Sequence, residues 1–164
     1  SGDRVPLLCI DKHPTQPHLI VTGGQDGVLS LWDMRQERYP VTLLEAHSAE
    51  IWEVMFYTTN PDHLFTCSHD GAVWQWNGSS MKTPSLDISR ILKSAPTTPL
   101  NGTDESNAPT PWLSADASKH KIETFSLLPY NRSPVNSIDV TGQSLVCGTD
   151  GEAVYILENL DPGV

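Results

Sequence analysis

The sequence is short of basic residues and of long apolar runs. Only 10 lysines and arginines stand against 20 aspartates and glutamates, and no basic cluster reaches five residues. Direct binding to nucleic acid is therefore not expected, because contact with phosphates relies on clustered positive charge. No stretch approaches the roughly 18 consecutive apolar residues of a membrane-spanning helix, so we expect no insertion into a membrane.

Motifs for catalysis, cofactors and metals are also missing. The sequence contains no P-loop, no dinucleotide fingerprint and no nucleophile elbow, and its six histidines show no metal-ligand spacing. Ser68-His69-Asp70 spells the letters of a hydrolase triad, but consecutive residues of a strand point to opposite faces. We therefore expect a protein that is not an enzyme and that has no cofactor, metal or small-molecule substrate.

A repeat built on Asp-Gly turns is what the sequence does contain. The string GGQDGVLSLWDMR returns 44 positions later as HDGAVWQWN and a third time around Asp150-Gly151. Repeats of about 40–45 residues with Asp-Gly turns and a terminal Trp-Asp form the WD40 pattern, in which each repeat folds as one four-stranded propeller blade. The repeat residues are Asp26, Gly27, Trp32 and Asp33 in the first copy, Asp70, Gly71 and Trp76 in the second, and Asp150, Gly151 and Ile156 in the third.

The pattern predicts an all-β fold of about three propeller blades. The units cover residues 1–45, 46–130 and 131–164 within one partial propeller domain. Val28 to Asp33 carries apolar side chains on both faces, which is typical of a strand packed between neighbouring blades. Rings contain about four to eight blades, so we expect this chain to be the C-terminal part of a longer one. The last blade has no outer strand of its own, and we expect another part of the ring to supply it.

A buried polar network is predicted in the second unit. His47, Ser68, Asp70 and Trp76 occupy the places where WD repeats carry a hydrogen-bonded tetrad. A neutral imidazole can bridge the turn carboxylate and a hydroxyl, and the indole N–H completes the chain of hydrogen bonds. This network would stabilise the blade without performing chemistry, and the other two units are expected to lack it.

The cysteines are expected to be free thiols. Cys67 and Cys147 each lie three residues before a repeat aspartate, so they occupy one structural position in two blades. Cys9 is the third, and an odd number at such long spacings favours packing over a disulfide framework or a metal site. We therefore expect a reducing compartment, the cytosol or the nucleus.

A long insert interrupts the second unit at residues 78–117. Of these 40 residues, 21 are Gly, Ser, Thr, Pro or Asn, which predicts a disordered surface segment. Within it, Ser85 to Lys93 could form short amphipathic helical turns that present Leu86, Ile91 and Leu92 to a partner; a passive linker is the alternative. Trp112-Leu113 is expected to mark the place where the chain docks again.

Threonines and a serine that precede proline are candidates for phosphorylation. An exposed site of this kind suits a proline-directed kinase, and the added charge could weaken a docked contact. The candidates are Thr83, Thr98 and Thr110 in the insert and Ser133 beyond it.

With the repeats in place, the chain resembles the small WD-repeat nucleoporins of the outer ring of the nuclear pore, members of the Y-shaped scaffold complex. The match is carried by RVPLLCIDKHP, VTGGQDGVLSLWDMRQ, AHSAEIWEVMF, NPDHLFTCSHDG, VNSIDV and LVCGTDGEAVYI. The resemblance implies a non-catalytic seven-bladed scaffold that binds other outer-ring nucleoporins and serves nucleocytoplasmic transport. It implies a place in the nucleus, at the pores of the nuclear envelope, and at kinetochores in mitosis.

Two other functions stay open at this point. Trp32-Asp33-Met34-Arg35 resembles the WDxR motif of propellers that act as substrate receptors for cullin-4 ubiquitin ligases, with Arg35 exposed on one rim. The other is a propeller that binds basic peptides through an acidic face. It would require carboxylates clustered around the central channel, for which the candidates are Asp3, Asp11, Glu50, Glu53 and Asp139.

Overall fold

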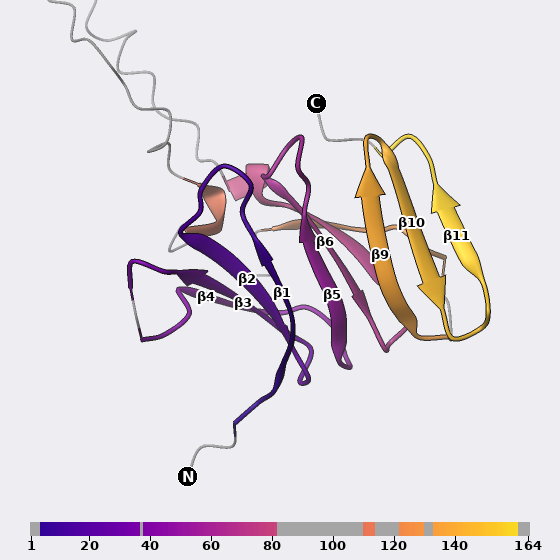
Figure 1. Ribbon diagram of the computed structural model, residues 1–164, viewed down its shortest axis with the longest axis horizontal. Helices are drawn as coiled ribbons and strands as arrows, with labels where there is room; N and C mark the ends of the chain where they lie inside the picture. The colour runs from indigo at the N-terminus through magenta and orange to yellow at the C-terminus, as the bar shows by residue number, and fades with distance from the viewer. Residues whose placement is uncertain (1–3, 37, 82–109, 114–121, 130–132, 161–164) are drawn as a thin grey trace, which may run out of the picture.

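Three antiparallel sheets, side by side, make up the computed structural model, which describes residues 4–36, 38–81, 110–113, 122–129 and 133–160 (Figure 1). The first sheet contains β1 (Leu7–Lys12), β2 (Leu19–Gly24), β3 (Val28–Asp33) and β4 (Thr42–Glu45). The second contains β5 (Ile51–Phe56), β6 (His63–Ser68), β7 (Val73–Asn77) and β8 (Glu123–Ser126). The third contains β9 (Val135–Thr141), β10 (Ser144–Thr149) and β11 (Val154–Leu157). Two short 3-10 turns, η1 (Gly78–Met81) and η3 (Pro111–Leu113), complete the described elements, none of which is a helix long and apolar enough to cross a bilayer.

Strand β6 of the middle sheet is buried on both faces. All six residues of β6 are buried. Its Leu64 packs in the apolar cluster shared with the first sheet, whereas Phe65 and Cys67 pack in the cluster shared with the third. Successive side chains of a strand point to opposite faces, so a strand that is buried at every position must lie between two layers. The sandwiched strands predicted from the repeat are thus present.

Neighbouring sheets are also joined by hydrogen bonds between their innermost strands, β1, β5 and β9, which lie in that order in Figure 1. Asp11 accepts a hydrogen bond from the backbone N–H of Phe56 at 2.7 Å, which joins the first sheet to the second. Glu53 accepts one from the N–H of Ile138 at 2.5 Å, which joins the second to the third. In each case, a carboxylate of one sheet accepts a hydrogen bond from a backbone N–H on the innermost strand of the next sheet.

The first two Asp-Gly turns share one geometry. Gly27 and Gly71 have φ values of 78° and 84°, in the left-handed region that favours glycine. Asp26 accepts a hydrogen bond from the N–H of Val28 at 3.1 Å, and Asp70 accepts one from the N–H of Ala72 at 2.9 Å. The carboxylate thereby holds the turn in each case, which is why Asp precedes Gly.

The third turn differs from the other two, and the expected match of Ile156 to the two tryptophans is wrong. Cys67 pairs with Val73, six residues on, but Cys147 pairs with Tyr155, eight residues on. The left-handed residue of this longer loop is Glu152 and not Gly151. Because pairing has moved by two residues, Ile156 lies opposite Val146 on the edge strand and is 65% exposed.

Substituting Gly27 should show how tightly the first turn is packed. A Cβ at Gly27 would strike the carbonyl oxygen of His47, whereas a Cβ at Gly142, also left-handed, would meet nothing within 4 Å. We expect Gly142→Ala to lower the free energy of unfolding by about 1 kcal/mol and Gly27→Ala by about 3 kcal/mol. Urea unfolding of both variants measures this, and equal losses would contradict the close approach.

Candidate functional site

A chain of polar side chains runs through the middle sheet. The Nδ1 atom of His47 lies 3.0 Å from one carboxylate oxygen of Asp70, and its Nε2 atom lies 2.8 Å from the hydroxyl of Thr66. The indole N–H of Trp76 donates to that same hydroxyl oxygen at 3.0 Å. The hydroxyl proton is then left to donate to Nε2, and Nδ1 carries the proton that Asp70 accepts. His47 has a fully buried side chain, and every polar atom of the chain has a partner.

Ser68 does not belong to this chain, contrary to the sequence prediction. Its hydroxyl donates to the carbonyl of Ala49 at 3.3 Å and accepts from the N–H of Asp70 at 3.1 Å. Thr66 takes its place because it stands two residues earlier on the same face of β6, within reach of both rings. Thr22 makes the same contact with Trp32 in the first sheet at 3.0 Å, so the repeated threonine was the signal in the sequence.

Hydrogen bonds lower the pKa of Asp70. Burial acts to raise this pKa, but donors from His47, Ala72 and Ser48 outweigh it and hold the pKa well below its usual range. The carboxylate is therefore ionised wherever the protein is folded near neutral pH. Its hydrogen bonds to His47, Ser48 and Ala72 hold two segments of the second sheet together, so the network has a structural role.

The complete chain occurs only in the second sheet among the described residues. In the first sheet, the position that corresponds to His47 is residue 3, which lies outside the described part. In the third sheet, Val146 stands where Thr66 stands, and Asp150 instead accepts a hydrogen bond from Asn136 at 2.5 Å. Among the described residues, the complete chain of His47, Asp70, Thr66 and Trp76 is thus a feature of the middle blade.

Trp112 anchors the returning insert between the first and second sheets. Its side chain is fully buried, and its ring lies 6.2 Å from that of Phe56, edge to face. The indole N–H donates to the carbonyl of Pro61 at 2.9 Å, and the hydroxyl of Thr42 donates to the carbonyl of Trp112 at 3.4 Å. A Cβ at Gly78 would meet the ring at 3.1 Å, so the residue that begins η1 has to be small.

Arg35 is tied to the aspartate two residues before it. Its guanidinium binds the Asp33 carboxylate through Nε at 2.8 Å and through a terminal nitrogen at 2.6 Å, while 58% of its side chain stays exposed. This contact is the main reason that the pKa of Asp33 falls to about 2. The arginine predicted as a partner contact is therefore on the surface but already paired.

Of the predicted phosphorylation sites and partner contacts that remain, only Thr110 and Ser133 lie within the described residues. Thr110 is half-buried, and its hydroxyl accepts a hydrogen bond from the N–H of Trp112 at 3.4 Å. Ser133 is also half-buried. The positions outside the described residues are Thr83, Thr98, Leu86, Ile91 and Leu92, with the rest of Ser85 to Lys93 and most of the insert 78–117.

Two of the five carboxylates proposed for an acidic face have a role within the fold. Asp11 and Glu53 are the carboxylates that join neighbouring sheets, and Asp3 lies outside the described residues. Cys9, Cys67 and Cys147 are free thiols whose pKa values are raised by burial, that of Cys9 to about 11. Within the described ranges, no three His, Cys, Asp or Glu side chains gather as a metal site would require.

Comparison with known families agrees with this geometry. The model of the WD domain, G-beta repeat, matches residues 1–33 and 38–77, which make up the first sheet and most of the second. The chain contains WD40 repeats. The predicted all-β fold of WD40 blades is therefore confirmed. The same fold recurs in the crystal structure of the computationally designed Ika8 protein, with a TM-score of 0.57 over 98% of this chain and 35% of that one, at 12% identity.

Alignments with two relatives cover nearly the whole length of this chain. It is 49% identical over 166 residues to nucleoporin Nup43 of Mus musculus and 47% identical over 167 residues to nucleoporin Nup43 of Homo sapiens. Each alignment covers 98% of this chain and 43% of the relative. The resemblance to small WD-repeat nucleoporins predicted from the sequence is thus confirmed, for a chain that spans less than half the length of these relatives.

Proposed function

We propose that this chain is part of a non-catalytic scaffold subunit of the nuclear pore complex. The observation that carries the proposal is the identity of 47–49% to two nucleoporins named Nup43, over 98% of the chain. The geometry supports it, since the buried polar groups of the described blades are used to hold the fold. A rigid body with many surface loops suits a protein that positions other proteins.

The partners we propose are other nucleoporins of the outer ring, bound through the faces and edges of a seven-bladed propeller. The outer faces of the first and third sheets expose apolar side chains of the kind that a neighbouring blade covers, among them Ile10 at 67% and Ile156 at 65%. With a net charge of −10, the chain suits protein partners better than nucleic acid. We propose a location at the pores of the nuclear envelope, and at kinetochores in mitosis.

Microscopy and affinity purification of the tagged protein test this proposal together. We expect a fluorescent rim around the interphase nucleus, signal at kinetochores in mitotic cells, and recovery of outer-ring nucleoporins from nuclear extract. A diffuse signal without enrichment of pore proteins would contradict the scaffold function. A rim without kinetochore signal would remove only the mitotic part.

We do not propose the alternative function as a ubiquitin-ligase substrate receptor. Repeating the purification with Arg35→Ala tests it. Arg35 is held by Asp33, and two relatives aligned over 98% of the chain are nucleoporins. We expect the variant to recover the same nucleoporins as the wild type. Loss of a cullin-4 adaptor from the variant, with the wild type recovering it, would favour the receptor function instead.

A further inference from the structure

The turn between β1 and β2, residues 13–18, is closed by a buried histidine. His13 follows β1 directly, and only 3% of it is exposed. Its Nδ1 atom lies 3.1 Å from the backbone nitrogen of Gln16 and 3.4 Å from that of Thr15, and both N–H groups donate to it. A side-chain acceptor for the N–H groups two and three residues further on is the pattern by which Asn and Asp close turns. His13 plays that part here with an imidazole.

These hydrogen bonds require a neutral ring. A backbone N–H can only donate, so Nδ1 is the nitrogen without a hydrogen, and the proton of the neutral ring of His13 is on Nε2. A protonated imidazole carries a hydrogen on both nitrogens and has no acceptor left. Turning the ring over does not restore the contact, because either nitrogen then presents an N–H to Gln16. One added proton therefore removes the acceptor that closes the turn.

The ring of His13 also connects the first two blades. It meets the ring of Phe56 on β5 edge to face, with 5.0 Å between the centroids. Phe56 packs in turn against Trp112, in the seam between the first and second sheets that receives the returning insert. The turn 13–18 thus holds the end of β1 against the second blade, and His13 is the residue that fixes it there.

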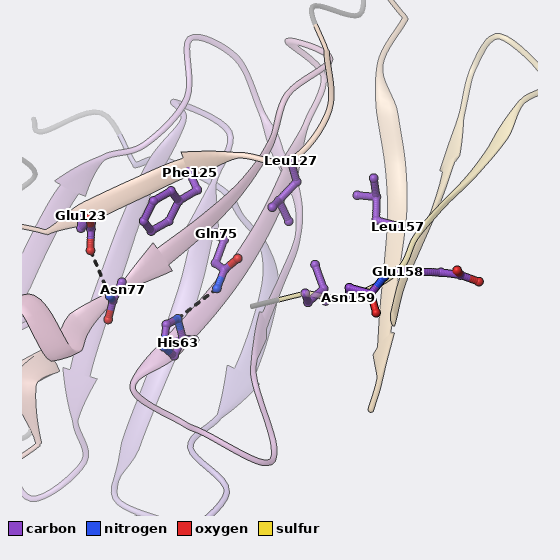
Figure 2. Close-up of a pocket in the computed structure, with 10 residues that line it drawn as sticks. His63, Gln75, Asn77, Glu123, Phe125, Leu127, Leu157, Glu158 and Asn159 are labelled. Carbon is purple, nitrogen blue, oxygen red and sulfur yellow. Dashed lines mark hydrogen bonds between the residues drawn. The ribbon is translucent and has the colours of Figure 1, made fainter. Parts of the chain in front are cut away.

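Two other histidines with buried side chains, His47 and His63, have partners that tolerate a proton. His47 faces the carboxylate of Asp70, which attracts a positive ring. His63 lies 3.1 Å from the side-chain amide of Gln75, and Figure 2 shows these two side chains pointing toward each other. An amide carries both an oxygen and an NH₂ group, so by turning over it can pair with either form of the ring. The backbone donors of the turn 13–18 have no such alternative.

Burial favours the neutral form of His13. It lowers the pKa of the ring below the ordinary value of 6.5, although the negative charges of Asp62 in the β5–β6 turn and Asp11 on β1 act to raise it; His18 of the same turn acts with burial. The closed turn therefore binds a proton less well than the open turn does. Its stability is complete above about pH 6.5 and is lost as the pH falls from there toward the lowered pKa.

We propose that His13 is an acid-sensitive latch: a proton on Nδ1 opens the turn 13–18 and withdraws the ring from Phe56 of the second blade. The inference does not depend on the scaffold function, since it concerns a contact between two blades of this chain. The opening is local and begins below about pH 6.5, whereas the contribution of Asp70 is lost only below about pH 4.

Nuclear magnetic resonance of the isotope-labelled protein between about pH 7.5 and pH 5 tests the inference. At the upper end, the long-range proton–nitrogen spectrum should show His13 with its proton on Nε2. As the pH falls below 6.5, the protection factor of the Gln16 amide should decrease about tenfold per pH unit until the ring is doubly protonated. The ring signals of Phe56 should move over the same range. A proton on Nδ1 at pH 7.5, or a Gln16 amide that keeps its protection when His13 is doubly protonated, would overturn the inference.

Two substitutions separate the proton of His13 from its shape. In His13→Asn, the side-chain oxygen takes the place of Nδ1 and accepts the same N–H groups without titrating. The protection factor of Gln16 should then no longer depend on pH. In His18→Asn, the matched control within the same turn, the decrease should persist. The same pH dependence in His13→Asn as in the wild type, or its loss in His18→Asn, contradicts the latch. If His13→Asn does not fold, the titration of the wild type and of His18→Asn decides the matter.

Discussion

Replacing Trp112 with alanine is expected to lower the free energy of unfolding by about 3–5 kcal/mol. The ring is fully buried between two sheets, and its N–H is bonded to the carbonyl of Pro61. Alanine would leave a cavity at the seam and a buried carbonyl without its donor, and both effects destabilise. Urea unfolding followed by far-UV circular dichroism measures the loss without relying on the removed fluorophore.

Trp52 provides the matched control for this substitution. It lies on β5 with 38% of its surface exposed, and its ring meets only the edge of His69 at 6.2 Å among the ring contacts of the described residues. Trp52→Ala should therefore cost far less than Trp112→Ala. Similar losses for the two variants would mean that the insert is not an integral part of the blade seam.

Replacing Asp70 with asparagine is expected to destabilise the protein by about 2–3 kcal/mol at pH 7 and to make it less sensitive to acid. The folded pKa of Asp70 is lower than its unfolded value near 4. Its contribution to stability is thus complete above about pH 4 and is lost as the pH falls through that value toward the folded pKa. Urea unfolding at pH 7, 5, 4 and 3 should show the difference between wild type and variant shrinking.

Asp26→Asn is the control for the charge of Asp70. Asp26 holds the equivalent turn of the first sheet through the N–H of Val28, but the described residues place no histidine against it. We expect Asp26→Asn to cause a smaller loss of stability than Asp70→Asn at pH 7. A loss for Asp70→Asn that persists unchanged at pH 3 would show that packing, and not the ionised carboxylate, accounts for its role.

The strands of the first two blades were predictable because the apolar residues and the turn residues indicate the same strand boundaries. Val28 to Asp33 was predicted as a strand and is β3 with the same bounds, since an Asp-Gly turn starts it and both of its faces are buried. The third hairpin was not predictable in the same way. Its string also contains Asp-Gly, but pairing is decided by packing across the sheet, and the two-residue shift keeps every side chain on its face.

The sequence predicted the buried hydrogen-bonded network but assigned one of its residues wrongly. His47, Asp70 and Trp76 were placed by the repeat, whereas the hydroxyl was assigned to Ser68 and belongs to Thr66. Both residues face the same side of β6, and only the reach of the two rings separates them. The aromatic residue Trp112 within a polar segment predicted where the chain docks again. The place where it packs, between the first and second sheets, could not be predicted because its contacts are far apart in the sequence.

The two short turns that flank residues 82–109 meet at one corner of the second blade. η1 leaves β7 there and η3 returns there, with the Trp112 ring against Gly78. The ends of the intervening segment are therefore fixed by the blade, whatever its length. Doubling the length of such a closed segment adds only about 0.6 kcal/mol of chain entropy. The chain entropy of closing this stretch therefore changes little when residues are gained or lost in it.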